Sequence, residues 1–188
     1  MNDVEIIDID ENTKVFIFSV DKNIAMANLS MVPKYREDID KTKRLLARVF
    51  LFEHCKKHYG LEDFSFEYTD KGRPKFKNSE IDFSISYSKD IIGVAISTKP
   101  KIGLDIEFLE PLMVSDRVAL EFMSSDEFLT FSKLINDDKK RYFYEVWTSK
   151  ESFLKAKGDG LYTNPKGVVN TKGQFFYFKN FIASFTRI

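Results

Sequence analysis

Several stretches of the chain predict β-strands, because apolar and polar side chains alternate in them or β-branched and aromatic residues gather. Lys89 and Asp90 separate two of these stretches and predict the tip of a hairpin. Residues 1–13 are acidic, and we expect them to be loose at the chain end. The predicted strands cover residues 14–20, 64–68, 81–88, 91–97, 102–108, 167–169, 174–178 and 181–186.

Two long helices are predicted from apolar residues spaced at the helical period. The first covers residues 39–59, and Gly60 follows it as a stop signal. The second starts before Trp147 and ends at Gly158. The stripe of the first helix that we expect to be buried consists of Leu45, Leu46, Val49 and Phe52.

Two shorter helices are predicted between the strands and the second long helix, at about residues 115–122 and 125–135. Ser125 with the acids Asp126 and Glu127 after it is a suitable N-terminal cap for the latter. Residues 136–138 are polar, and we expect them to separate this helix from the next.

The order of elements predicts an α+β fold, because each half of the chain offers one long helix and antiparallel strands. We divide the chain into an N-terminal half, residues 1–100, and a C-terminal half, residues 101–188, which form one functional unit. Two halves within one chain predict a self-sufficient monomer.

Composition narrows the class of protein. Lys+Arg and Asp+Glu number 29 each, which argues against a general nucleic-acid binder or a polybasic membrane protein. The single cysteine, Cys55, excludes an intramolecular disulfide and a multi-cysteine zinc cluster, and it fits a reducing compartment. No signal peptide or long apolar run is visible, so we expect a soluble cytoplasmic protein.

Candidate chemistry lies on the second long helix, where Trp147, Glu151 and Lys155 are spaced i, i+4, i+8 and share one face. A surface ion pair between Glu151 and Lys155 would explain the spacing equally well, and such a pair contributes only a few tenths of a kcal/mol.

Two more carboxylates lie on the predicted strand 102–108. Its alternation places Asp105 and Glu107 on one face, together with Gly103, which leaves room for a ligand. Like charges at this spacing are costly unless a cation lies between them, although an exposed sheet face would also tolerate them. If the helix brings Glu151 to this strand, the three carboxylates form a hard-oxygen site suited to Mg²⁺.

The segments IGLDIE at residues 102–107 and WTSKESFLK at residues 147–155, with their spacing, resemble the two signature motifs of 4'-phosphopantetheinyl transferases. The more similar type is the larger, monomeric one that activates peptide synthetases such as the surfactin synthetase. The resemblance covers about residues 35–165.

The resemblance implies a fold and a reaction. Members of this type have two similar α+β halves related by a pseudo-two-fold axis, each a long helix packed on an antiparallel sheet, with coenzyme A bound between them. They transfer 4'-phosphopantetheine from coenzyme A to a serine of an acyl or peptidyl carrier protein. Adenosine 3',5'-bisphosphate is released, and Mg²⁺ bridges the pyrophosphate.

The resemblance also implies roles for residues of the two motifs. Asp105, Glu107 and Glu151 correspond to the metal ligands. Lys155 and Glu151 belong to the catalytic set, and Lys155 is either the base for the carrier serine or a phosphate ligand. Lys150 corresponds to a further phosphate contact, unless it is a solvated helix lysine.

Further contacts to coenzyme A follow from basic and polar positions outside the two motifs. Arg73 lies in a Gly-Arg-Pro segment that resembles the family's Gly-Lys-Pro, near the 3'-phosphate, and arginine can bind phosphate in a bidentate way. Arg36, and Arg44 with its neighbour Lys43, resemble the family's N-terminal basic contacts. For Lys43 and Arg44 a solvated helix face is the competing interpretation.

One segment departs from the family. Residues 83–88 read FSISYS where the family has Phe-Asn-x-Ser-His-Ser. Ser86 keeps the family identity, whereas Tyr87 replaces a phosphate-contacting histidine and brings a hydroxyl but no charge. Glu127 stands where the family often has an acid near the site, although an acid in the first turn of a helix needs no functional explanation.

Two other functions remain open from the sequence. A Mg²⁺-dependent hydrolase could split a nucleotide pyrophosphate with the same carboxylates and water as nucleophile. An adaptor could bind coenzyme A or a carrier protein without turnover. For all three functions we expect no nucleic-acid partner and no membrane association.

Overall fold

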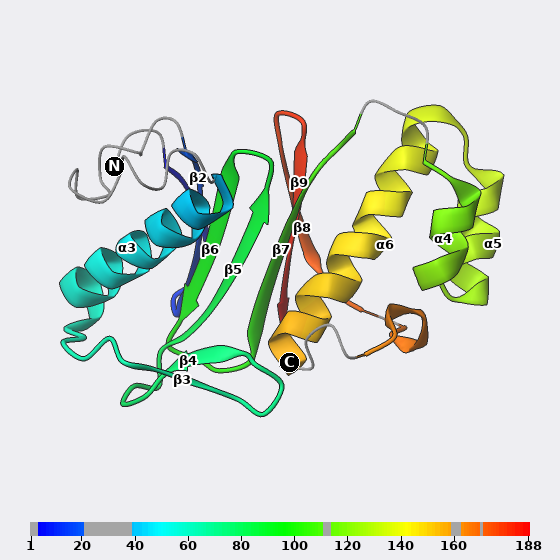
Figure 1. Ribbon diagram of the computed structural model, residues 1–188. Helices are drawn as coiled ribbons and strands as arrows, with labels where there is room; N and C mark the ends of the chain where they lie inside the picture. The colour runs from blue at the N-terminus through cyan, green and yellow to red at the C-terminus, as the bar shows by residue number, and fades with distance from the viewer. Residues whose placement is uncertain (1–3, 21–38, 111–113, 159–162, 170) are drawn as a thin grey trace. The chain divides into compact units, whose positions relative to one another are not determined.

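The computed structural model describes residues 4–20, 39–110, 114–158, 163–169 and 171–188 (Figure 1). Its helices and antiparallel sheets confirm the α+β class. The chain forms two compact units, which we call the first and the second unit. The first comprises residues 1–68 and 74–100, and the second comprises residues 69–73 and 101–188.

The first unit is built on a four-stranded antiparallel sheet in the order β1-β2-β6-β5. Among the described residues of this unit the helix α3 accompanies the sheet, and β3 and β4 form a separate two-stranded ribbon. The bounds are β1 Glu5–Asp10, β2 Thr13–Ser19, α3 Ile39–Tyr59, β3 Phe66–Tyr68, β4 Pro74–Phe76, β5 Asp82–Ser88 and β6 Ile91–Ser97.

The helix α3 agrees with its predicted bounds, but its buried stripe differs in part. Leu46 is buried as expected, whereas Phe52 is exposed and its ring lies tilted against that of Phe64. Phe50 and Cys55 occupy the inner face instead, against Phe18 and the other buried residues of the sheet. The stripe is shifted because aromatic residues on α3 and β2 fill the core together.

The acidic N-terminus also departs from expectation. Residues 5–10 form the edge strand β1, which pairs with β2 and is mostly exposed. The strand is held by backbone hydrogen bonds to β2, and few of its side chains are buried. The pattern of hydrophobic residues therefore gave only a weak signal for a strand there.

The second unit consists of a three-stranded antiparallel sheet in the order β7-β9-β8 and a group of helices. The helix α6 lies between the sheet and the pair α4 and α5 (Figure 1). The bounds are β7 Ile102–Phe108, α4 Asp116–Phe122, α5 Ser125–Lys133, α6 Asn136–Lys157, η3 Pro165–Gly167, β8 Gln174–Phe178 and β9 Phe181–Arg187.

Several boundaries in the second unit correct the sequence-based ones. Residues 136–138 are the first turn of α6 rather than a separator. The segment 167–169 is no strand, because η3 occupies its start. Gly158 ends α6 as predicted, in the left-handed conformation that glycine adopts without strain.

The cap of α5 lies one residue earlier than expected. Ser124 accepts a hydrogen bond from the Glu127 backbone, and the Glu127 side chain accepts one from the Ser124 backbone at 2.7 Å. This reciprocal pair is a capping box, which satisfies two backbone donors that the helix itself leaves open.

The two units share a chain topology. In each unit a strand is followed along the chain by a helix and later by a β-hairpin, and the second strand of the hairpin pairs antiparallel with the opening strand. These elements are β2, α3, β5 and β6 in the first unit, and β7, α6, β8 and β9 in the second. This likeness supports the expected similarity of the halves, and a two-fold relation between them stays a prediction.

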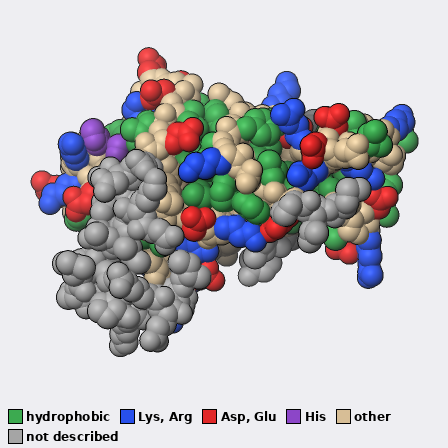
Figure 2. All heavy atoms as spheres, turned by 90° about the horizontal axis from the view of Figure 1, so that it is seen from above, with side chains coloured by type: hydrophobic (Ala, Val, Ile, Leu, Met, Phe, Trp, Pro, Cys, Tyr) green, Lys and Arg blue, Asp and Glu red, His purple; other side chains and the backbone are tan. Residues whose placement is uncertain are grey.

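Charged side chains of both signs are interspersed over the described part of the face in Figure 2, in keeping with the neutral net charge. No helix in the described ranges is long and apolar enough to span a membrane.

We predict that Ser124→Ala lowers the free energy of unfolding by about 1 kcal/mol, because the α5 cap loses its side-chain acceptor. Ser125→Ala is the matched control, since Ser125 is exposed and already inside the helix. Urea denaturation of both variants measures the difference. A larger loss for Ser125→Ala would contradict the assignment of the cap.

Candidate functional site

The predicted functional face of α6 lies against β7. Lys155 Nζ donates a hydrogen bond to Asp105 Oδ1 at 2.7 Å and one to the Leu104 carbonyl at 3.0 Å. Asp105 is only 5% exposed, which rules out the interpretation of this carboxylate as a solvated group on an open sheet. Lys155 therefore neutralises a buried negative charge.

Trp147 makes the corresponding contact two turns earlier in α6. Its indole Nε1 donates to Glu107 Oε1 at 3.2 Å, and its ring packs edge-on against Phe122 of α4. Trp147 precedes Lys155 on α6, whereas its partner Glu107 follows Asp105 on β7, so helix and strand run antiparallel to each other at this contact.

Glu151 lies between these two contacts on α6. The pKa of its carboxyl is raised, mainly because the group is partly buried and also because the negative charge of Asp105 is near; Lys155 acts in the opposite direction. The structure therefore brings Glu151 into the same electrostatic environment as Asp105 and Lys155.

Within the part of the chain that the structure describes, no three His, Cys, Asp or Glu side chains come together closely enough to hold a metal ion. The donor types nevertheless fit a hard cation, because carboxylate oxygens are the ligands that Mg²⁺ prefers. In this structure Asp105 is held by Lys155, so a metal ion bound to Asp105 would share the carboxylate with the ammonium.

Gly103 serves a different purpose from the expected one. A Cβ at this position would overlap the Ser152 carbonyl oxygen and lie 2.6 Å from the Ala156 nitrogen. The space beside Gly103 is thus occupied by the backbone of α6, not left for a ligand. Glycine is needed because helix and strand approach each other so closely.

Small hydroxyl side chains continue this close approach. The Ser152 hydroxyl lies 3.1 Å from that of Ser184 and 2.8 Å from that of Thr186, both on β9. All three side chains are buried, and their mutual hydrogen bonds satisfy polar groups that would otherwise be costly to bury.

Lys150 does not face outward as a phosphate contact would. It is 1% exposed, and its ammonium is paired with Glu127 Oε2 at 2.7 Å and donates to the carbonyls of Phe122 and Pro165. Neither of the two interpretations from the sequence, phosphate ligand or solvated lysine, anticipated this internal position.

Arg73 belongs to the second unit. Its guanidinium donates to the Lys155 carbonyl near the end of α6 and, at 2.8 Å, to the Ile102 carbonyl at the start of β7. A cation at the last turn of a helix also meets the negative end of the helix dipole. Sequence reasoning missed this structural role, since only the fold brings these carbonyls together.

The first unit holds the other predicted contacts. Ser86 is buried in β5, and Tyr87 beside it is half-buried. Burial raises the pKa of Tyr87 to about 12, while the positive charges of Arg48 and Arg44 on α3 act in the opposite direction. Arg48 was missed from the sequence, although it lies one helical turn after Arg44. Arg36 lies outside the described residues.

Comparison with known proteins identifies the chain's relatives. Residues 101–184 match the sequence profile of the 4'-phosphopantetheinyl transferase superfamily. The 4'-phosphopantetheinyl transferase HetI of Nostoc sp. (strain PCC 7120) is 28% identical over 144 residues, which are 73% of this chain and 59% of the relative. The chain belongs to the 4'-phosphopantetheinyl transferase superfamily.

Two further members of the superfamily are similar over comparable stretches. The 4'-phosphopantetheinyl transferase psf-1 of Bacillus pumilus is 26% identical over 155 residues, 81% of this chain and 65% of the relative. The 4'-phosphopantetheinyl transferase Sfp of Bacillus subtilis (strain 168) is 32% identical over 130 residues, 68% of this chain and 56% of the relative. The chain thus spans between 56% and 65% of the length of these three relatives.

We predict that Gly103→Ala destabilises the protein by about 1–3 kcal/mol, because α6 must move away from β7 to admit the methyl group. Gly167→Ala is the control, since nothing lies within 4 Å of a Cβ there. Urea unfolding followed by the fluorescence of Trp147, the single tryptophan, measures both. Equal stability of the two variants would contradict the close approach.

Proposed function

We propose that the protein transfers 4'-phosphopantetheine from coenzyme A to a serine hydroxyl of an acyl or peptidyl carrier protein. In this reaction the serine oxygen forms an ester with the phosphorus that bears pantetheine. The P–O bond to the nucleotide breaks, the serine proton is lost to a base, and adenosine 3',5'-bisphosphate leaves. Superfamily membership supports the class of reaction.

The observation that carries the proposal is the contact of Lys155 with Asp105, inside the region that matches the superfamily. It combines a buried carboxylate on β7 with a cation on α6, next to Glu151 on the same helix. Phosphoryl transfer depends mainly on positioning and on neutralising charge, and this set of side chains can do both.

Lys155 acts in the proposal as a cation. Its Nζ donates hydrogen bonds to Asp105 Oδ1 and to the Leu104 carbonyl, and an ammonium has a third N–H to offer. Such a group suits a phosphate oxygen. To act as the base for the carrier serine, Lys155 would first have to lose a proton and give up one of these contacts.

Mg²⁺ is the proposed cofactor, with Asp105, Glu107 and Glu151 as the residues that would hold it. When bound, it would neutralise the charge that develops on the diphosphate. Two side chains already orient this set, because Trp147 holds Glu107 and Lys155 holds Asp105.

Positive side chains in each unit are the proposed contacts for the phosphates of coenzyme A. In the first unit these are Arg44 and Arg48 on α3, with the hydroxyls of Ser86 and Tyr87 on β5. The two arginines supply the charge that Tyr87 lacks in comparison with a histidine. In the second unit the proposed contact is Arg73.

We predict that the protein adds one phosphopantetheine group to an apo carrier protein in the presence of coenzyme A and Mg²⁺, and that EDTA abolishes the gain. Asp105→Ala and Glu151→Ala should reduce the transfer at least about 100-fold, because the charge on the diphosphate is no longer neutralised. Intact mass spectrometry of the carrier protein measures the product.

An exposed acid far from Glu151 on the same helix provides the control. Asp137→Ala, in the first turn of α6, should transfer at the wild-type rate. Wild-type rates for Asp105→Ala or Glu151→Ala would refute the metal assignment. Consumption of coenzyme A without a mass gain would indicate the pyrophosphate hydrolase, and binding without either product would indicate the adaptor.

We also predict that Arg48→Gln weakens the binding of coenzyme A about twofold to fivefold, the magnitude expected for an exposed charge contact. Lys57→Gln, an equal loss of charge in the last turn of the same helix, should have no effect. Titration calorimetry with coenzyme A and with its 3'-dephospho form measures the difference. An equal loss for both ligands would show that Arg48 does not contact the 3'-phosphate.

A further inference from the structure

Among the described residues of the second unit, Lys150 is the most deeply buried charged side chain that the proposed reaction leaves unused. Its Nζ lies 2.7 Å from Glu127 Oε2, 2.8 Å from the Phe122 carbonyl oxygen and 3.1 Å from the Pro165 carbonyl oxygen. An ammonium has three protons, and these three acceptors use them all. A phosphate could replace one of them only if the interior opened.

The three acceptors of Lys150 belong to three different elements. Phe122 is the last residue of α4, Glu127 lies in the first turn of α5, and Pro165 begins η3. Lys150 itself is on α6. One side chain therefore joins three elements to α6, through one carboxylate and two carbonyls.

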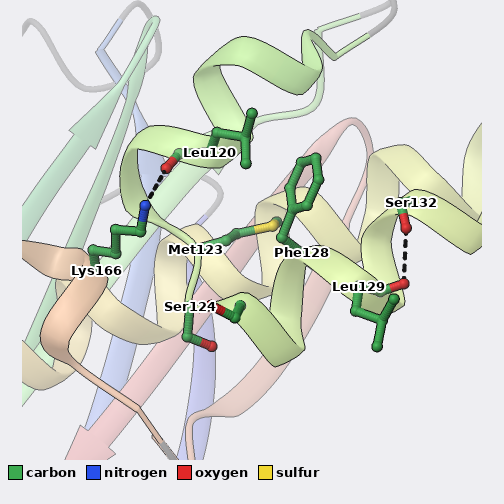
Figure 3. A pocket seen from close by; sticks show the side chains of 8 residues that line it. Leu120, Met123, Ser124, Phe128, Leu129, Ser132 and Lys166 are labelled. Atoms are coloured by element: carbon green, nitrogen blue, oxygen red, sulfur yellow. Dashed lines mark hydrogen bonds between the residues drawn. The ribbon is translucent and has the colours of Figure 1, made fainter.

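A pocket of about 300 Å³ lies next to this junction (Figure 3). Its wall residues Met123, Phe128 and Lys166 directly follow the three acceptors of Lys150 in the sequence. In Figure 3 the side chain of Met123 extends toward Phe128, which packs against the same hydrophobic cluster, and Lys166 reaches the Leu120 carbonyl. The residues that bind Lys150 and residues that line the pocket are thus direct neighbours in the chain.

Glu127 has two tasks at the junction. The same oxygen, Oε2, accepts the α5 cap hydrogen bond from the Ser124 backbone and pairs with Lys150. Removal of either partner leaves the other charge in the interior, which is far more costly than removal of both. The energies of the two side chains are therefore strongly coupled.

The junction is connected with the functional face of α6 through short steps. Lys150 directly precedes Glu151, about 100° around the helix. Phe122, whose carbonyl binds Lys150, packs its ring against Trp147, and Trp147 donates to Glu107. A continuous path of contacts thus runs from Lys150 through Phe122 and Trp147 to Glu107 on β7.

We propose that Glu127 and Lys150 form a positioning pair, which fixes the rotation of α6 so that Glu151 and Lys155 face the carboxylates of β7. Lys150 is then no phosphate ligand. The geometric part of this inference stands on the contacts of the second unit, and its consequence for the reaction rate rests on the proposed transferase function.

The single tryptophan offers a direct test, since Trp147 lies between Phe122 and Glu107. We expect Glu127→Gln and Lys150→Met each to shift the Trp147 emission to longer wavelength and to make it more accessible to acrylamide. The double variant Glu127→Gln/Lys150→Met removes both charges, and we expect it to be no worse than the worse single variant.

Kinetics of transfer to an apo carrier protein give the second readout. Both single variants should lower kcat about 10- to 100-fold, the effect of displaced catalytic groups, while the dissociation constant of coenzyme A stays unchanged. The measurements are made at a temperature at which circular dichroism shows each variant to be folded. If a single variant does not fold, the double variant is measured in its place.

Lys166→Met is the matched control. Lys166 also donates to the carbonyl of a residue in α4, Leu120, but does so from the exposed rim of the pocket. Its replacement should leave the emission of Trp147, kcat and the affinity for coenzyme A at the wild-type values.

Two results would overturn the proposal. Weaker binding of coenzyme A by Lys150→Met, with wild-type behaviour of Glu127→Gln, would make Lys150 a phosphate ligand. Wild-type emission and kcat in both folded single variants would show that the pair only stabilises the fold and does not position α6. If the wild-type protein shows no transfer, the transferase function fails, but the emission and acrylamide measurements still decide whether the pair positions α6.

Discussion

The close packing of α6 on β7 is the constraint on which the rest of the second unit depends. Gly103 has no side chain, and the backbone of α6 occupies the space that one would fill. Ser152 then reaches the hydroxyls of β9, and Lys155 reaches a buried carboxylate on β7. A helix that lay farther out would leave Asp105 buried without its cation, so packing and electrostatics require the same short distance.

Two lysines on α6, five residues apart, have opposite surroundings. Lys150 is enclosed by a carboxylate and two carbonyls, whereas Lys155 is partly exposed and pairs with the acid of the signature strand. Both are charged groups that the fold must compensate. The first holds α4, α5 and η3 against the helix, and the second lies among the groups proposed to act on coenzyme A. The same motif thus serves structure at one position and, in the proposed reaction, chemistry at another.

The superfamily match and the described contacts concern the same part of the chain. Residues 101–184 include β7 and α6, and the contacts of Asp105, Glu107, Trp147 and Lys155 all lie within this range. The first unit adds a pair of arginines near Tyr87. Because this chain spans between 56% and 65% of the length of the relatives described above, transfer to a carrier protein is tested best on this chain itself.

The sequence by itself determined the α+β class, the bounds of α3 and β7, the end of α6 at Gly158 and the pairing of two motifs, because periodicity and glycine signals act locally. It also predicted that Trp147 and Lys155 share a face. Only the tertiary structure decided what that face meets, that Gly103 admits a helix rather than a ligand, and that Lys150 points inward to Glu127. Those facts depend on segments far apart in the chain, and a local pattern cannot distinguish a lysine that is solvated from one whose three acceptors come from three other elements.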